Sequence, residues 1–163
     1  MTRRAIVAAC AILLLTLATS PASAQIVRLT AKLSGGNETP AKIVTGAFGN
    51  ADCTVDLGKG GEINCTGSVF NLPSGATVGH IHVGADGVGG PTVCNANIPN
   101  NISNDFGFTI GPCTSVTITL RADQGIRSFE DFLQAVLGEN TYVNVHTVVN
   151  PGGEVRGQLM LKP

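Results

Sequence analysis

The sequence contains three histidines, and all three fall in short segments with the pattern of β-strands. His80 and His82 stand two residues apart, so in a strand both project from one face while Ile81 and Val83 project from the other. His146 lies in a second segment of the same kind. We expect the histidine side chains to point away from the core, from the polar face of their strands. If the two strands are neighbours, the three imidazoles would come together there.

Three imidazoles in one place suit a copper or zinc ion with a fourth position open to water or a small molecule. His80, His82 and His146 are therefore the candidate metal ligands. Two other interpretations stay open. The histidines can be ordinary polar residues on a solvated face, or they can hydrogen-bond the loop 85–91 and fix it. Asp86 in that loop could support a histidine or a cation, although Asp-Gly is first a turn pair.

Other chemistry finds little support. No serine sits in a GxSxG motif. The glycine-rich segment 84–91 lacks the following helix that a phosphate-binding loop requires. Glu38, Glu154 and Arg156 flank turns, and we interpret them as a glutamate–arginine pair that braces the chain ends. The sequence thus favours a protein without catalytic residues, and copper is the one cofactor that it suggests.

Alternating apolar and polar residues predict the strands that must position these groups. Strands are expected at 27–33, 53–57, 62–66, 77–83, 115–121, 141–149 and 155–161, and a polar loop at 95–104. Apolar residues at helical spacing predict one helix from Phe129 to Leu137, capped by Ser128. The fold class is therefore all-β, an antiparallel Greek-key sandwich or barrel with one short α-helix.

The cysteines are expected to form disulfides. In a hairpin turning about Lys59, Cys53 lies opposite Cys65, within reach of a disulfide bond. Cys94 and Cys113 then pair by subtraction. A cysteine zinc site is the alternative, but the sequence contains no CxxC spacing.

Residues 1–24 have the three parts of a secretory signal peptide. Arg3 and Arg4 precede an apolar run at 5–18, and the small residues 22–24 form a cleavage site. The run is too short to span a bilayer. Cleavage of the signal peptide removes Arg3 and Arg4 and leaves a single domain, 25–163, with 8 basic and 11 acidic residues. We expect a secreted or periplasmic protein without a stable membrane span. Its partner, a protein or small ligand, stays unknown, and the mild acidity excludes nucleic acid.

Four segments of the chain resemble the motifs of the CHRD domain family, in the same order. They read LSGGNETP at 33–40, GHIHVGADG at 79–87, YVNVHT at 142–147 and GEVRGQL at 153–159. The resemblance spans roughly residues 29–161. It implies a β-strand fold found in secreted proteins, with no generally established catalytic activity. The cysteines do not belong to the motif.

The segment 79–87 followed by Cys94 is also similar to the copper-binding HxH segment and following cysteine of Cu,Zn superoxide dismutases. His146 would match a further copper ligand by role. No histidine lies between His82 and His146, so the bridging histidine and the zinc ligands have no counterpart. We expect an exported CHRD-domain protein that acts as a non-enzymatic binding or structural module. The alternative is a copper-binding protein with a three-histidine site and superoxide dismutase-like activity.

Overall fold

The structure is a computed structural model that describes residues 25–98 and 103–163. Its strands are β1 (Ile26–Ser34), β2 (Phe48–Asp56), β3 (Glu62–Phe70), β4 (Ala76–Val83), β5 (Thr92–Asn97), β6 (Phe106–Cys113), β7 (Thr141–Thr147), β8 (Val155–Gln158) and β9 (Met160–Leu161). Its helices are α1 (Phe129–Leu137) and three 3-10 turns, η1 (Gly35–Asn37), η2 (Leu57–Lys59) and η3 (Ala122–Gln124). The expected signal peptide, residues 1–24, lies outside the described residues.

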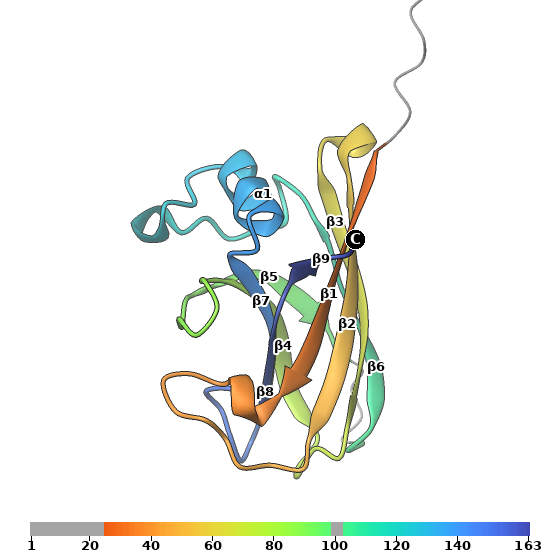
Figure 1. Ribbon diagram of the computed structural model, residues 1–163, viewed down its shortest axis with the longest axis vertical. Helices are drawn as coiled ribbons and strands as arrows, with labels where there is room; N and C mark the ends of the chain where they lie inside the picture. The colour runs from red at the N-terminus through yellow and green to blue at the C-terminus, as the bar shows by residue number, and fades with distance from the viewer. Residues whose placement is uncertain (1–24, 99–102) are drawn as a thin grey trace, which may run out of the picture.

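Eight strands close into an antiparallel barrel (Figure 1). Around the barrel the order is β1-β2-β3-β6-β5-β4-β7-β8, and β8 returns to β1, while the short β9 pairs with the other half of β1. The order departs from the chain order after β3 and after β4, as in a Greek key. The predicted all-β antiparallel fold is therefore confirmed, in its barrel form. No described helix is long and apolar enough to cross a membrane.

Period-two alternation explains the strands that the sequence predicted correctly. In β1, Leu29, Ala31 and Leu33 are buried, and the residues between them face outward. The same alternation in β4 and β7 sends Ile81 and Val143 into the core. Burial of these side chains on one face sets the register, because a slip by one residue would expose the whole set.

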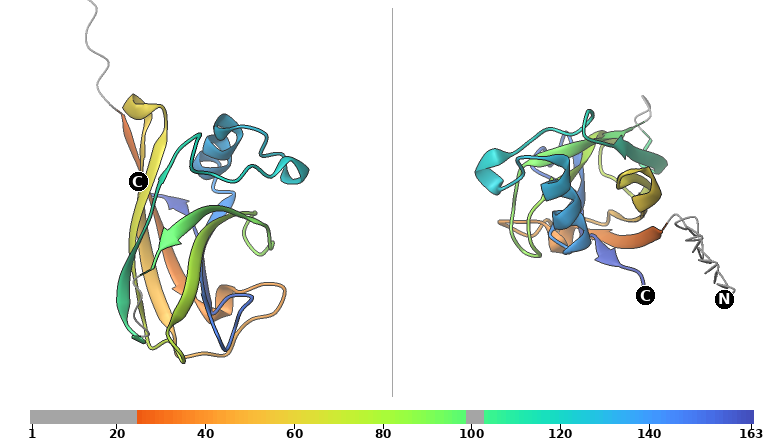
Figure 2. Two further views of the ribbon diagram at one scale, coloured as in Figure 1. Left: turned by 180° about the vertical axis from the view of Figure 1, so that it is seen from behind. Right: turned by 90° about the horizontal axis from the view of Figure 1, so that it is seen from above.

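Helix α1 lies across one end of the barrel (Figure 2). It begins at Ser128, whose hydroxyl accepts a hydrogen bond from the Asp131 N–H, as the capping pattern predicted. Phe132, Leu133 and Val136 form its buried face. The helix thus covers apolar core that the strands leave open at this end.

Both predicted disulfides are present. Cys53 and Cys65 are direct partners across β2 and β3, with Cα atoms 4.0 Å apart. Cys94 on β5 is joined to Cys113 at the end of β6, with Cα atoms 6.0 Å apart. All four cysteines are buried, so the bridges lie within the core and tie neighbouring parts of the barrel together.

The predicted strand at 115–121 is wrong, and so is the start of the predicted loop at 95–104, because residues 95–97 belong to β5; residues 98, 103 and 104 lie outside strands, and 99–102 lie outside the described residues. Residues 115–121 form turns, and Val116 and Leu120 are 89% and 51% exposed, because no strand pairs with this segment. The Thr117 hydroxyl donates to the Pro112 carbonyl and accepts from the Thr114 N–H, which stabilises the turn instead. The missing strands are β5 and β6, whose outward residues include asparagine, glycine and proline and therefore obscure the alternation.

We predict that the double substitution Cys94→Ala/Cys113→Ala lowers the free energy of unfolding by about 3 kcal/mol. The bridge closes a loop of 19 residues, which restricts the unfolded chain. Urea denaturation of the oxidised proteins measures the loss. The double variant at Cys53 and Cys65, whose loop is 12 residues, is the matched comparison and should lose slightly less. Equal stability of wild type and the Cys94/Cys113 variant would contradict the prediction.

Candidate metal centre

The antiparallel pairing of β4 with β7 places the three histidines. Val78 pairs with His146 and His80 pairs with Asn144, so His80, His82 and His146 all project from the outer face of these two neighbouring strands. Ile81 and Val143 are partners on the inner face and lie in the core. The structure therefore brings together all three of the candidate ligands that the sequence suggested.

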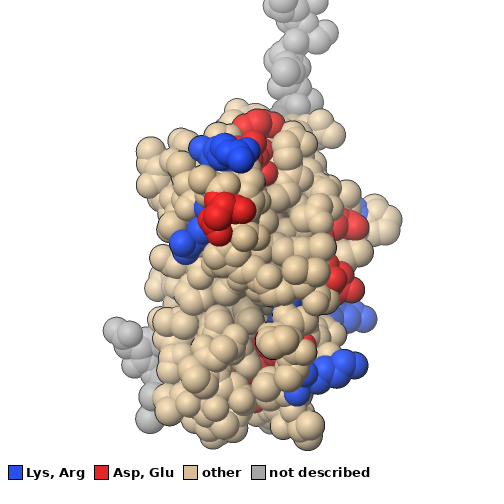
Figure 3. Space-filling model, turned by 90° about the vertical axis from the view of Figure 1, so that its left-hand side faces the viewer, with Lys and Arg blue, Asp and Glu red and all other residues tan. Residues whose placement is uncertain are grey.

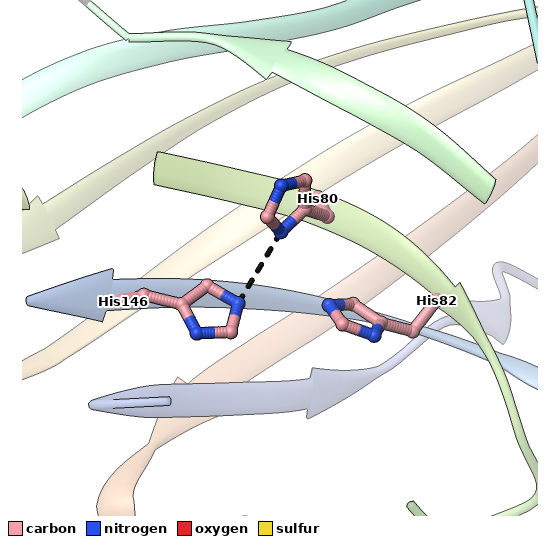
Figure 4. A group of neighbouring side chains, drawn as sticks. All are labelled: His80, His82 and His146. Carbon is pink, nitrogen blue, oxygen red and sulfur yellow. Dashed lines mark hydrogen bonds between the residues drawn. The ribbon is translucent and has the colours of Figure 1, made fainter. Parts of the chain in front are cut away.

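The imidazole rings point toward one another (Figure 4). The Nδ1 atom of His80 is 3.3 Å from the Nε2 atom of His146. One ring nitrogen from each of the three histidines lies within 4.8 Å of the others. Nitrogens bound at 2.0–2.1 Å to a tetrahedral ion are about 3.3–3.4 Å apart. The His80–His146 spacing thus already fits a metal ion, and small ring rotations would bring His82 to the same distance.

Backbone carbonyls orient two of the rings. The Nδ1–H of His82 donates to the Gly90 carbonyl at 2.8 Å, and the Nδ1–H of His146 donates to the Pro151 carbonyl at 3.0 Å. Because a carbonyl can only accept, each ring carries its proton on Nδ1 and turns the Nε2 lone pair toward the centre. Histidines that bind metals are held in this way by a hydrogen bond from the other nitrogen.

The Nε2 lone pair of His82 is buried and has no hydrogen-bond partner among the residues that the structure describes. The corresponding lone pair of His146 faces the His80 ring, which can supply an Nδ1 proton to it. A buried acceptor without a partner costs free energy in the range of about 1–3 kcal/mol. The arrangement therefore leaves a place for an electron-pair acceptor at the middle of the three rings.

Of the two other interpretations, a solvated face is wrong for His82 and His146, whereas a histidine does hydrogen-bond the loop 85–91, through His82 and Gly90. His82 and His146 are only 8% and 7% exposed, and His80 is half-buried. The loop 84–91, the turn at Pro151 and the loop 35–47 cover this side of β4 and β7 (Figure 1). Figure 3 shows that side of the molecule, where uncharged residues make up most of the surface. His80 is the ligand nearest to solvent.

Burial keeps the imidazoles neutral. Desolvation, together with the neighbouring His146, lowers the pKa of His80 to about 4. Desolvation also lowers the pKa of His82 to about 4, although the hydrogen bond to Gly90 opposes the shift. The pKa of His146 is lowered for the same reason, against the bond to Pro151. All three rings are therefore unprotonated near neutral pH, which is the form that binds a metal.

Tyr142 holds His82 in place. The two rings stack with centroids 4.8 Å apart and an angle of 11° between their planes. The Tyr142 hydroxyl bonds both the N–H and the carbonyl of Gly90, the residue that also accepts from His82. A side chain at position 90 would overlap the Val83 carbonyl, so only glycine fits there. The glycine-rich loop thus orients a histidine and does not cradle a phosphate.

Glu38, Glu154 and Arg156 do not form the expected brace. All three are buried, but Arg156 makes no ion pair with either acid within the part of the chain described. Desolvation raises the pKa of Glu38 to about 7, against the hydrogen bond from Asn144 and the charge of Arg156. Sequence reasoning missed that these groups border the histidine site, because they belong to separate segments.

Asp86 is exposed and makes no hydrogen bond to a histidine among the described residues. The four cysteines of the described chain are held in disulfides and are not free to bind a metal. The candidate donors are thus three imidazoles. This set suits copper and zinc and does not suit magnesium or calcium, which prefer oxygen.

A comparison with protein families supports the resemblance that the sequence suggested. Residues 29–159 match the family model described as CHRD domain. No curated protein and no solved structure matches the chain.

We predict that the metal-free protein loses stability as the pH falls from 6.5 to 4. In this window the unfolded histidines, with pKa values near 6.5, take up protons that His80 and His82 in the folded protein do not. Glu38 opposes the trend, because its raised pKa makes the folded state bind the extra proton between about pH 4.5 and 7. Urea denaturation at pH 7 and pH 4.5 measures the difference.

The variant His80→Asn/His82→Asn should lose less stability between these two pH values than wild type. The variant Glu38→Gln should lose more, since it lacks the opposing group. An unchanged pH dependence in the histidine variant would show that the imidazoles titrate alike in the folded and unfolded states.

Proposed function

The chain belongs to the CHRD domain family, and from this premise we propose that it is an exported binding module that holds a copper ion on His80, His82 and His146. The unpartnered, buried Nε2 lone pair of His82 is the observation that carries the proposal. Burial disfavours protonation of this nitrogen, so near neutral pH its lone pair is free to bind a metal ion. Most buried polar side-chain atoms have a hydrogen-bond partner, so a lone pair left without one at the centre of three imidazoles supports a metal site.

Copper is favoured over other divalent metals by the donor set. Affinity for nitrogen ligands rises along the first transition series to Cu²⁺ and falls again at Zn²⁺. Three imidazoles provide no negative charge, and Glu38 and Glu154 are not among the grouped donor atoms. Three histidine ligands would leave one coordination position of the ion open. His80 is the most exposed of the three histidines, so this open position would lie on its side, closest to solvent.

The role of each ligand follows from its contacts. Gly90 and Pro151 hold the His82 and His146 rings with Nε2 facing inward, so these two ligands are preorganised. His80 hydrogen-bonds His146 in the metal-free protein and must move its proton to Nε2 before Nδ1 can bind a metal. We therefore assign His80 as the ligand that opens and closes the site during metal entry and release.

Export is part of the proposal. Its support is the leader-like sequence at 1–24 and the two disulfides, which persist in oxidising compartments. A metal-binding module outside the cytoplasm would bind or pass on copper there. No catalytic group is required for this role.

Copper titration tests the site. We expect wild type to bind one Cu(II) ion, and His82→Gln to bind it at least about 100-fold more weakly because one preorganised ligand is lost. Asn95→Ala is the matched control, since Asn95 pairs with His80 across β4 and β5 and is exposed. Isothermal titration calorimetry on the dialysed protein measures the affinities.

Equal affinity of wild type and His82→Gln would overturn the proposal. A superoxide dismutase assay on the copper-loaded wild type distinguishes binding from turnover. We expect no activity above that of the His82→Gln variant, and a clear difference would replace the non-enzymatic role with a catalytic one.

Export is tested by the N-terminus of the product. We expect N-terminal sequencing of the protein recovered outside the cytoplasm to begin at Gln25, because the small residues before it form the cleavage site. A protein that retains Arg3 and Arg4 in the cytoplasm would contradict this part of the proposal. Substitution of Ala22 and Ala24 by bulky residues should block cleavage and serves as the control.

A further inference from the structure

A buried arginine lies behind one of the candidate ligands. Arg156 packs on Tyr142, and Tyr142 stacks on His82, so the three side chains form one column. We propose that the charge of Arg156, held against His82 by Tyr142, biases the centre toward Cu(I) over Cu(II). The proposal deepens the proposed copper site and rests on it, since it names the oxidation state that the site retains.

The column is short and well ordered. The guanidinium carbon of Arg156 is 3.5 Å from the centroid of the Tyr142 ring, and this ring is 4.8 Å from that of His82. The rings of Tyr142 and His82 are nearly parallel, 11° apart. The positive charge is thus within about 8 Å of a candidate metal ligand, without room for solvent between them.

Among residues 25–98 and 103–163, no acid forms an ion pair with Arg156. The side chain is 1% exposed, and its hydrogen bonds go to uncharged oxygens. These acceptors are the Thr39 hydroxyl, the Ala85 and Val88 carbonyls and the Gln158 amide oxygen. A buried guanidinium with neutral partners exerts its charge on nearby groups more strongly than an exposed one.

Two acids lie in the same region, and neither forms an ion pair with Arg156 in the described part of the chain. Burial raises the pKa of Glu38 to about 7, so a large part of it is protonated near neutral pH. One carboxylate oxygen of Glu154 accepts hydrogen bonds from the Thr147 hydroxyl and the Asn150 side-chain amide.

A positive charge beside the ligands destabilises bound Cu(II) more than bound Cu(I), because Cu(II) carries the higher positive charge. Reduction of bound Cu(II) by one electron, taken from a mediator dye in solution, gives Cu(I) and removes one positive charge from the buried centre. Three neutral imidazoles add no negative charge to compensate Cu(II). A metal ion on Nε2 of His82 would lie slightly farther from the guanidinium than this ring, at roughly 10 Å, where one unit charge changes such an equilibrium by about tenfold at an effective dielectric constant near 20.

Thr39→Asp tests the inference without removing Arg156. Thr39 is partly exposed, and its hydroxyl accepts from Arg156 at 2.7 Å, so aspartate at this position pairs with the guanidinium. Thr39→Asn is the matched control, because asparagine has the same shape as aspartate but no charge. We expect the midpoint potential of bound copper to fall by at least about 59 mV in Thr39→Asp, a tenfold change for one electron. Thr39→Asn should match wild type.

Arg156→Gln and Arg156→Lys provide the second comparison. Glutamine removes the charge and should lower the midpoint potential of bound copper. Lysine keeps the charge, so the potential of that variant should lie close to that of wild type. Copper binding and the near-ultraviolet circular dichroism of Tyr142 show whether each variant is folded. Should Arg156→Gln not fold, the Thr39 pair alone decides.

Two failures are distinguishable. If wild type binds no copper in the titration described above, the proposed function is wrong. If wild type and all folded variants bind copper with the same midpoint potential, the copper site stands and the role of Arg156 is overturned.

Discussion

Burial of the outer face of β4 and β7 is the constraint on which the rest of the site depends. A strand pair at the surface of a barrel would ordinarily leave His82 and His146 in water, protonated in part and free to rotate. Here two loops and a turn remove the solvent, so the imidazoles stay neutral and their orientation is set by the Gly90 and Pro151 carbonyls. The same desolvation raises the pKa of Glu38 and leaves Arg156 with neutral partners.

Arg156 links the covering loops to the barrel. Its guanidinium donates to Thr39 in the loop 35–47 and to Ala85 and Val88 in the loop 84–91. Its backbone carbonyl accepts from Asn37. One side chain on β8 therefore closes both loops over the histidines and, through Tyr142, acts on His82. The covering of the site and its electrostatics therefore both depend on this one buried side chain.

Much of the fold could be predicted because local rules act there. The hairpin register that joins Cys53 to Cys65 follows from glycines at the turn and apolar alternation on both sides. The start of α1 follows from the Ser128 cap. The strands β5 and β6 could not be found in this way, since Asn95 and Pro112 interrupt the pattern and hydrogen bonding to neighbouring strands outweighs local preference. Residues 115–121 alternate correctly but lack a partner strand.

The sequence by itself determined which residues can bind a metal and which face of each strand they share, because alternation in a strand is a local property. It also placed the cysteines opposite each other in the first hairpin. Only the tertiary structure decided that β4 and β7 are neighbours, that loops exclude water from the histidines, and that Arg156 lies behind Tyr142. These features join segments such as 38–39, 80–90 and 142–156. Long-range packing brings them together, and no local pattern encodes how much solvent remains between them.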